Sequence, residues 1–221
     1  MQRKCYVKAS ANQNQLNMNL FQNFGSKAAI VIGQPLSGKS ELLQGYVVAG
    51  LKTKQPIVFI TTDKSAEQIK KELLAAKIFY GSSLKIIDCY SKQTNESCKD
   101  SADVVRVSGP LALNEISIAL SEIEAELIKK SKSHWIIFDS LSTVLMYTNP
   151  PTVGRFVQVL VSRIKNAGGS VLFSIEEGMH EQNAVVTIEH LMDCIIEVKM
   201  EKRKIQVKAR GIAGFESWKP L

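Results

Sequence analysis

The sequence predicts an α/β fold with a mostly parallel sheet, helices on both faces of that sheet and a C-terminal antiparallel hairpin. Short apolar runs of strand length alternate with longer stretches in which apolar residues recur at helical spacing. Strands that are apolar throughout are typical of a parallel sheet buried on both faces. Two strand-length runs then follow one another directly, at 194–200 and 204–209, and predict the hairpin. At 221 residues, the chain is expected to form one domain over residues 25–221, after a polar lead-in at residues 1–24.

The first half of that domain contains three predicted strands separated by helices. The strands lie at 28–32, 57–60 and 85–88. The helices between them carry apolar stripes at Leu42, Leu43, Tyr46, Val47 and Leu51, and at Ile69, Leu73 and Leu74. Ser65, followed three residues later by Gln68, is a capping-box signature that opens the second helix. The polar segment 91–103 is predicted to be a surface loop.

The second half continues the alternation. A long amphipathic helix is predicted over about residues 114–130, and the apolar strand Trp135–Phe138 follows it and ends at Asp139. Another helical stripe, at 153–164, closes at a glycine pair before a fifth strand at 170–175. A last helix at 185–192 leads into the hairpin. This order predicts right-handed crossovers between parallel strands.

Composition indicates an ordinary globular protein. Apolar residues make up 45% of the chain and charged residues 22%, and no run approaches the length of a membrane span. The basic first residues are not followed by an apolar stretch, and the four cysteines are scattered, so a cytoplasmic location is expected. The net charge of +7 permits nucleic-acid binding without favouring it, because lysines on an edge hairpin also discourage strand pairing.

A phosphate-binding motif follows the first predicted strand directly. The P-loop, or Walker A, pattern GxxxxGK[ST] is matched by Gly33, Gln34, Pro35, Leu36, Ser37, Gly38, Lys39 and Ser40. The motif also lies where its chemistry requires, between a strand and the start of a helix. An accidental match in a glycine-containing turn is the alternative, and the agreement of strand, loop and helix argues against it.

Each residue type in this motif has a physical role. Gly33 and Gly38 allow the backbone to curl so that successive N–H groups point at phosphate oxygens, and the dipole of the following helix adds to the attraction. Lys39 is expected to reach the β- and γ-phosphates, and the Ser40 hydroxyl to ligate Mg²⁺. The sequence therefore predicts a site for ATP, or a closely related nucleoside triphosphate, with Mg²⁺.

Asp139 is the predicted second ligand for the metal. It ends a strand of bulky apolar residues, a pattern that delivers a carboxylate beside a P-loop to hold Mg²⁺ directly or through water. The alternative is that Asp139 only caps the helix that begins near Leu141.

Three features carry a resemblance to a known family: the proline at the third position of the P-loop, the run Phe138-Asp139-Ser140-Leu141-Ser142-Thr143, and the tail Lys208-Ala209-Arg210-Gly211. Together they resemble the KaiC-like branch of the RecA superfamily of P-loop NTPases, particularly its small, single-domain, archaeal-type members. The resemblance extends from about Gly25 to Pro220. It implies a RecA-like core and a homo-oligomer, such as a hexameric ring, with nucleotide bound at the subunit interfaces.

The resemblance also implies a basic pair that reaches the γ-phosphate bound by the adjacent subunit. Lys208 and Arg210 match that pair, and residues two apart on a strand share a face, so both side chains are able to project across an interface. Exposed charges on an edge strand are the alternative explanation.

The chain departs from the family at the residue that activates water. The family usually has adjacent glutamates after the strand that follows the P-loop helix, whereas this chain has Asp63 and Lys64 there. Asp63 is the candidate catalytic carboxylate, but it is one methylene shorter, and the adjacent cation is expected to lower its basicity. Hydrolysis is therefore predicted to be slow or absent. Glu176 and Glu177 are an alternative source of a base, unless they lie in a solvent-facing loop.

Three functions follow. The first is a slow ATPase, or a switch whose assembly or signalling state is set by ATP and which acts on a protein partner. The second is an active ATPase in DNA recombination or repair, and the third is an accessory ATPase of an archaeal motility or secretion machine. No basic loop with interleaved aromatic residues supports the second.

Overall fold

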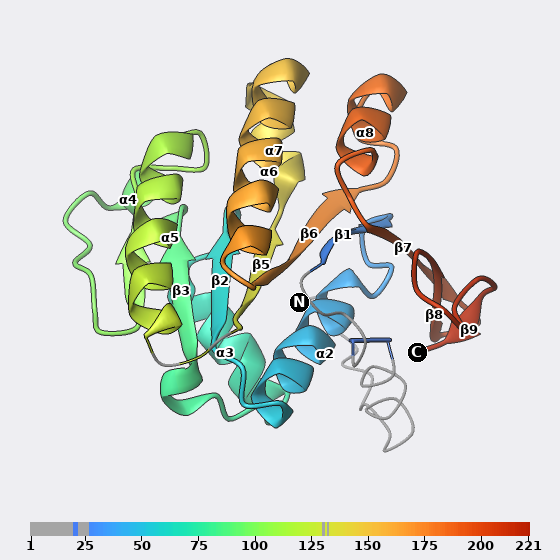
Figure 1. Cartoon of the computed structure of the whole chain (residues 1–221), viewed down its shortest axis with the longest axis horizontal. Coiled ribbons are helices and arrows are strands. Elements are labelled where there is room, and N and C mark those ends of the chain that lie inside the picture. Colours follow the sequence, from blue (N-terminus) through green and yellow to red (C-terminus); the bar gives the residue numbers. More distant parts are fainter. Residues whose placement is uncertain (1–19, 22–26, 130, 132) are drawn as a thin grey trace, which may run out of the picture.

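The computed structural model describes residues 20–21, 27–129, 131 and 133–221, and its elements alternate as the sequence predicts (Figure 1). The strands are β1 (Ala28–Gly33), β2 (Ile57–Thr61), β3 (Leu84–Asp88), β4 (Val104–Arg106), β5 (Trp135–Asp139), β6 (Ser170–Glu176), β7 (Cys194–Glu201), β8 (Lys204–Arg210) and β9 (Lys219–Pro220). The helices are α2 (Lys39–Lys52), α3 (Ala66–Ala75), α4 (Ser91–Thr94), α5 (Leu113–Ile128), α6 (Leu141–Tyr147), α7 (Pro150–Asn166) and α8 (Gln182–Glu189), with a 3₁₀ turn at Gly81–Ser83.

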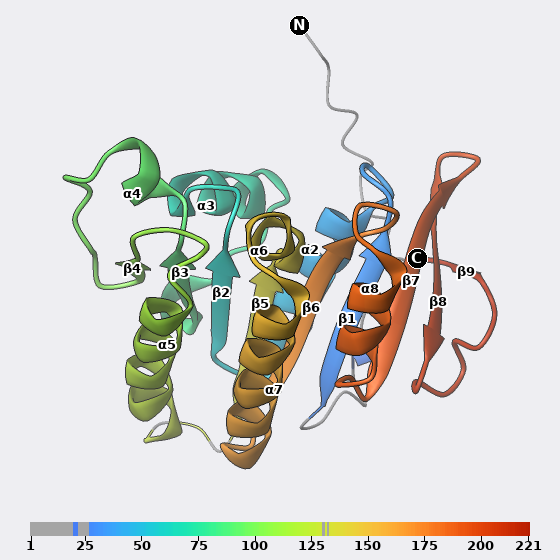
Figure 2. The ribbon, with the colours of Figure 1, turned by 90° about the horizontal axis from the view of Figure 1, so that it is seen from above.

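These strands form one sheet in the order β4-β3-β2-β5-β6-β1-β7-β8-β9, which Figure 2 shows from above. Pairing is parallel from β4 to β7, whereas β8 and β9 are antiparallel to their neighbours. The predicted α/β class, with a mostly parallel sheet and a C-terminal antiparallel hairpin, is therefore confirmed.

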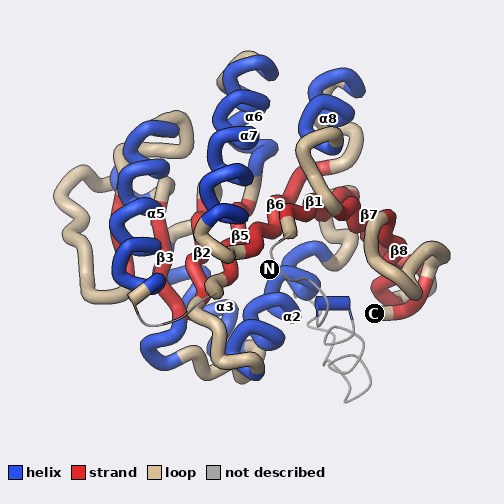
Figure 3. Tube along the Cα trace, viewed as in Figure 1, coloured by secondary structure: helices blue, strands red, loops and turns tan. Residues whose placement is uncertain are grey.

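Helices cover both faces of the sheet (Figure 3). Helices α2 and α3 pack on one face, where Val31 and Phe59 belong to a core with Leu42 and Leu73. Helices α5, α6 and α7 cover the other face, where Ile30 packs in a second core. Because alternate residues of β1 enter different cores, this strand is buried on both sides, as its continuous apolar run predicts.

Several local predictions need correction. The segment 91–103 is not all loop, because Asp88 accepts hydrogen bonds from the backbone and hydroxyl of Ser91 and so starts the short helix α4. Strands β4 and β9 were not predicted, since each is only two or three residues long. The predicted cap of α3 is confirmed, with Ser65 Oγ accepting from Gln68 N at 3.1 Å. Helix α8 begins three residues earlier than the predicted 185–192.

Most of the predicted lead-in, residues 1–24, lies outside the described residues. Leu20 and Phe21 are described and are fully buried. The ring of Phe21 meets that of Tyr46 edge to face at 4.9 Å, so these two residues belong to the same core as helix α2.

The strand order brings the carboxyl ends of β2, β5, β6 and β1 together at one edge of the sheet. Gly33 is in register with Glu176, and Thr61 with Asp139. In parallel sheets this edge is where ligands bind, at the point where the strand order reverses. The fold therefore places the P-loop, Asp139, Glu176 and the turn after Thr61 on the same edge.

Candidate functional site

The P-loop connects β1 to α2 as the sequence predicts. Gly38 is the N-terminal cap of α2 and has a φ of 100°, which favours glycine. Residues 34–36 are exposed, and Leu36 is 94% exposed with a φ of 63°. Residues 37–39 are buried. The loop thus turns its first half to solvent and buries its second half at the start of the helix.

Both motif glycines are also required by packing against the C-terminal hairpin. A Cβ on Gly33 would lie 2.5 Å from the carbonyl oxygen of Val198 and 2.6 Å from Ser37 Oγ. A Cβ on Gly38 would lie 2.6 Å from the side chain of Ile205. Strands β7 and β8 therefore pack directly against the loop and limit the conformations that it can adopt.

The Lys39 ammonium is fully engaged inside the protein. Its Nζ atom donates to the carbonyl oxygens of Gly33 at 2.6 Å and Gln34 at 2.8 Å, and it forms an ion pair with Glu176 Oε2 at 2.8 Å. Of the two alternatives for Glu176 and Glu177, a solvent-facing loop does not hold for Glu176, which ends β6 and binds the P-loop lysine. Glu177 is exposed, although its N–H donates to Gly33 O at 3.0 Å.

The loop has features that fit a phosphate group. Ser37 Oγ is buried and has no hydrogen-bond partner among the described residues, so it carries unused donor capacity into the loop. The N-terminus of α2 points its free N–H groups into the same region. An anion with several oxygens would satisfy these groups and would compete with the present acceptors of Lys39.

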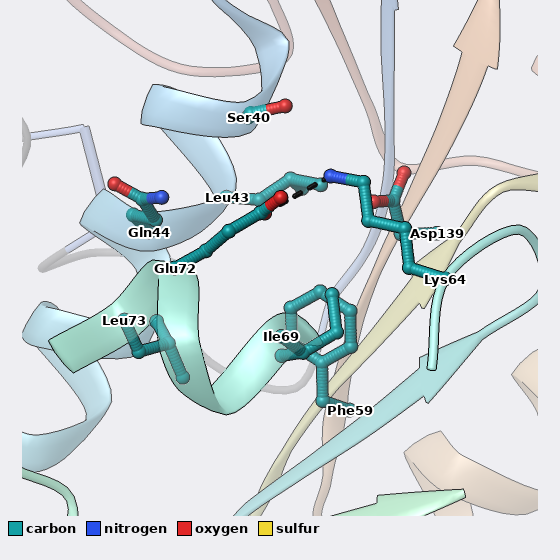
Figure 4. Close-up of a pocket in the computed structure, with 9 residues that line it drawn as sticks. All are labelled: Ser40, Leu43, Gln44, Phe59, Lys64, Ile69, Glu72, Leu73 and Asp139. Carbon is teal, nitrogen blue, oxygen red and sulfur yellow. Dashed lines mark hydrogen bonds and ion pairs between the residues drawn. The ribbon is translucent and has the colours of Figure 1, made fainter. Parts of the chain in front are cut away.

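Asp139 ends β5 and shares a small pocket with Ser40 (Figure 4). Its carboxylate accepts a hydrogen bond from Ser174, and Ser140 rather than Asp139 is the N-terminal cap of α6. Burial raises the pKa of Asp139, although the Ser174 hydrogen bond and the charges of Lys64 and Lys39 oppose the shift. The carboxylate is therefore free of a helix-capping role and faces the hydroxyl predicted to bind the same metal.

No group of three or more His, Cys, Asp or Glu side chains within the described ranges is arranged to hold a metal ion. Mg²⁺ commonly keeps several waters and takes one or two protein ligands together with substrate phosphates. Ser40 and Asp139 fit that mode of binding, in which the nucleotide supplies the remaining oxygens.

Asp63 lies in the turn after β2, on the same edge of the sheet. Burial, followed by the charge of Asp139, raises the pKa of Asp63 from 3.8 to about 6, and the charge of Lys64 lowers it by a smaller amount. Lys64 lowers the pKa of Asp63 as expected, but burial and the charge of Asp139 outweigh it, so the net shift is upward. The residue as a whole is exposed and can exchange protons with solvent, but its carboxyl group lies close enough to the surrounding protein to lose part of its hydration.

Lys208 and Arg210 both lie on β8 and share a face, as predicted. Each is paired within the chain, with Lys208 Nζ at 3.2 Å from Glu197 and Arg210 Nη2 at 3.5 Å from Glu189. Arg210 pairs in register with Ile195, and Ile195 with Ile30, well before the P-loop end of β1. The strand register therefore places Arg210 away from the P-loop of its own chain. A role toward the nucleotide of a neighbouring chain is part of the proposed function.

Two further groups lie at this edge and were not predicted from the sequence. Thr62 Oγ1 donates to the carbonyl oxygen of Ser140 at 3.0 Å and accepts from its N–H at 2.8 Å, which ties the end of β2 to that of β5. The other group is Glu72 on α3, which holds the Lys64 ammonium at 3.0 Å. Glu72 shows no motif, and only the folded chain brings it to the site.

A protein-family model described as a family of unknown function, DUF7504, matches residues 34–198. The chain belongs to this family. The match begins within the P-loop and includes Asp63, Asp139 and Glu176, whereas β8 with Lys208 and Arg210 lies beyond it.

Among solved structures, the fold is similar to that of the KaiC-like protein PH0186 from the hyperthermophilic archaeon Pyrococcus horikoshii OT3. The TM-score is 0.59 at 13% sequence identity, and the match covers 89% of this chain and 84% of that one. This likeness shows that the two chains share a fold. No curated protein matches the chain. Among the described residues, no helix is both long and apolar enough to cross a membrane.

Proposed function

We propose that this chain binds ATP with Mg²⁺ at Gly33–Ser40 and acts as a slow ATPase or a nucleotide-controlled switch on a protein partner. The observation that carries the proposal is the arrangement at the sheet edge. Three groups lie around one loop: a lysine at a helix N-terminus, a buried hydroxyl that is unpaired among the described residues, and the strand-end carboxylate Asp139. Anion binding at a helix N-terminus together with a carboxylate for Mg²⁺ is the chemistry of a nucleoside triphosphate site.

Each residue has a defined part in this proposal. Lys39 and the backbone N–H groups of the loop bind the phosphates, and Ser40 and Asp139 hold Mg²⁺. When bound, the metal neutralises phosphate charge and orients the terminal phosphate. Asp63 is the proposed base, because its pKa of about 6 brings proton uptake close to neutral pH. Its short side chain is the reason for expecting slow turnover.

The proposal includes a homo-oligomer with nucleotide at the interfaces between subunits. Lys208 and Arg210 support it, since Arg210 is 58% exposed and its ion pairs with Glu189 and Glu197 are long. Exposed ion pairs contribute little to stability, so their side chains can exchange partners at small cost. A second subunit carrying phosphate would offer a stronger partner.

The central test is the binding of a fluorescent ATP analogue in the presence of Mg²⁺. Lys39→Ala should abolish binding, because the phosphates lose their principal side-chain cation. Lys52→Ala, at the opposite end of the same helix, is the matched control and should bind as the wild type does. Equal binding by Lys39→Ala and the wild type would refute the proposal.

Turnover is measured in the same samples. Slow hydrolysis that Asp63→Asn abolishes supports an ATPase, whereas tight binding without turnover in either protein supports a switch. Stimulation of turnover severalfold by single-stranded DNA would instead indicate an ATPase acting on DNA.

A further inference from the structure

The side chain of Lys64 enters the pocket that contains the predicted metal ligands. That pocket is lined by Ser40 and Asp139 together with Lys64 and Glu72, over an apolar floor that includes Phe59 (Figure 4). The Lys64 ammonium therefore lies beside the proposed Mg²⁺ ligands. A lysine at this position places a second cation at the site, in addition to Lys39.

The turn that carries Lys64 is held in place by hydroxyl groups. Thr61 Oγ1 donates to the carbonyl oxygen of Lys64 at 2.9 Å, and Thr62 is bonded to Ser140 on the neighbouring strand. The side chain itself is 21% exposed and Glu72 is 17% exposed. A fixed backbone with a flexible four-carbon stem positions the ammonium in the pocket while allowing it to change partners.

The charges around Lys64 favour a cation. Burial acts to lower the pKa of Lys64, but the hydrogen bond and charge of Glu72, helped by Asp139 and Asp63, raise it above its ordinary value. The ammonium is thus retained although it is largely buried. Glu72 also accepts from Gln68 Nε2 at 3.4 Å, so its carboxylate keeps a hydrogen bond when Lys64 turns away.

We infer that Lys64 is a second phosphate-binding lysine. When a nucleoside triphosphate binds, the Lys64 ammonium exchanges its ion pair with Glu72 for one with the terminal phosphate. This contact makes nucleotide binding less dependent on Mg²⁺. The inference rests on the proposed function of the same site. Lys39 and Lys64 share one feature, since the ammonium of each pairs with one carboxylate, Glu176 or Glu72, at 2.8 or 3.0 Å. A terminal phosphate carries more charge than either carboxylate and offers several acceptor oxygens, so it competes well for both ammonium groups.

The test compares the affinity for a fluorescent ATP analogue in Mg²⁺ and in excess EDTA. The wild type should bind in both, more weakly in EDTA. Lys64→Ala should reduce the affinity for the ATP analogue by about tenfold or more in EDTA, as expected for the loss of a hydrogen bond between charged groups. In Mg²⁺ the reduction in affinity should be smaller. Lys64→Arg, which keeps the charge, should recover most of that loss. The matched control is Lys70→Ala, which removes a lysine on α3 that pairs with Asp103 at 2.6 Å outside the pocket.

A fluorescent ADP analogue separates the terminal phosphate from the rest of the nucleotide. Lys64→Ala should change ADP affinity in EDTA by less than it changes ATP affinity, because ADP lacks the phosphate that Lys64 is inferred to bind. Equal losses for the two nucleotides would overturn the assignment to the terminal phosphate. Thermal unfolding of each variant without nucleotide shows whether a loss of affinity arises from a loss of folded protein.

The failure of this inference is distinct from the failure of the proposed function. If the wild type does not bind ATP even in Mg²⁺, the proposed function fails. If the wild type binds in Mg²⁺ but not in EDTA, or if Lys64→Ala matches Lys70→Ala in EDTA, the inference about Lys64 is overturned and nucleotide binding stands. Glu72→Gln adds an independent check. The substitution removes the charged partner of Lys64, so the ATP analogue should bind more tightly in EDTA; weaker binding would contradict the inference.

Discussion

The Lys39 ammonium lies 2.8 Å from the carboxylate of Glu176, which ends the strand next to the P-loop strand. The same Nζ atom donates to Gly33 and Gln34, so its three N–H donors are all engaged within the protein. An incoming phosphate must therefore displace at least one of these acceptors. Glu176 is the charged acceptor among them and is thus an internal competitor for the lysine.

Glu176→Gln should strengthen the binding of an ATP analogue by about three- to tenfold, because a partly exposed ion pair contributes on the order of 1 kcal/mol. Titration at fixed Mg²⁺ measures the change. Glu177→Gln, the exposed neighbour, is the matched control and should have little effect. Weaker binding by Glu176→Gln would show that this carboxylate assists the ligand instead of competing with it.

Gly38→Ala should both destabilise the protein and abolish nucleotide binding. A left-handed φ costs a non-glycine residue about 1–2 kcal/mol, and the contact at 2.6 Å with Ile205 adds about 1–3 kcal/mol of overpacking. Urea unfolding measures the combined loss. Gly178→Ala is the control for backbone strain alone, since Gly178 has a φ of 75° and open space around it. Equal losses for the two variants would argue against a tight contact with Ile205.

Neighbouring charges should move the pKa of Asp63 in opposite directions. The negative charge of Asp139 raises this pKa and the positive charge of Lys64 lowers it. Asp139→Asn should therefore bring the pKa below about 6, and Lys64→Ala should raise it further. A carbon-13 NMR titration of the Asp63 carboxyl, without nucleotide or Mg²⁺, measures both shifts. A pKa that neither substitution moves would contradict the proposed cluster of charges.

The raised pKa of Asp63 also predicts how stability changes with pH. In the unfolded chain Asp63 loses its proton near its ordinary value of 3.8, whereas in the folded chain it keeps the proton until about pH 6. Its favourable contribution is therefore fully present below pH 3.8 and is lost as the pH rises through about 6. Asp63→Asn, which cannot ionise, should lose less stability than the wild type across this interval in urea unfolding. Parallel stability curves would contradict the shift.

Arg210→Ala should leave nucleotide binding to an isolated subunit largely intact while reducing assembly-dependent turnover by about tenfold or more, as expected for a lost contact between charged groups. The test measures ATP turnover at several protein concentrations, together with the molecular mass in solution at each concentration. Lys204→Ala is the matched control, because Lys204 is an exposed residue of the same strand and face but lies near the other end. A protein that stays monomeric with Mg-ATP would exclude a role in trans.

Much of the fold could be predicted because its local signals agree with one another. The apolar runs that became β1, β2, β5 and β6 are long enough to identify, and the Ser65 cap of α3 is visible in four residues. The short strands β4 and β9 were missed, because so few residues carry no detectable period.

Site residues could be predicted only where a motif within one continuous segment of the sequence identifies them. The P-loop and Asp139 each belong to a recognisable strand-end pattern, whereas the pairing of Lys39 with Glu176 depends on the parallel register of β1 and β6. The pKa of Asp63 was misjudged because only the adjacent Lys64 was considered, and burial at the sheet edge outweighs that neighbour. Position in the fold, not proximity in the chain, sets these properties.

The side chain of Ile205 fills the space beside Gly38, so the end of the P-loop packs directly against the β7–β8 hairpin. Ile205 lies on the same strand as Lys208 and Arg210, and the carbonyl of Val198 bears on Gly33 in the same way. Strand β8 thus contacts the P-loop at Ile205 and carries the basic pair, Lys208 and Arg210, farther along its length. One part of the hairpin is therefore fixed by packing against the loop, whereas the end of β8 presents the exposed side chain of Arg210.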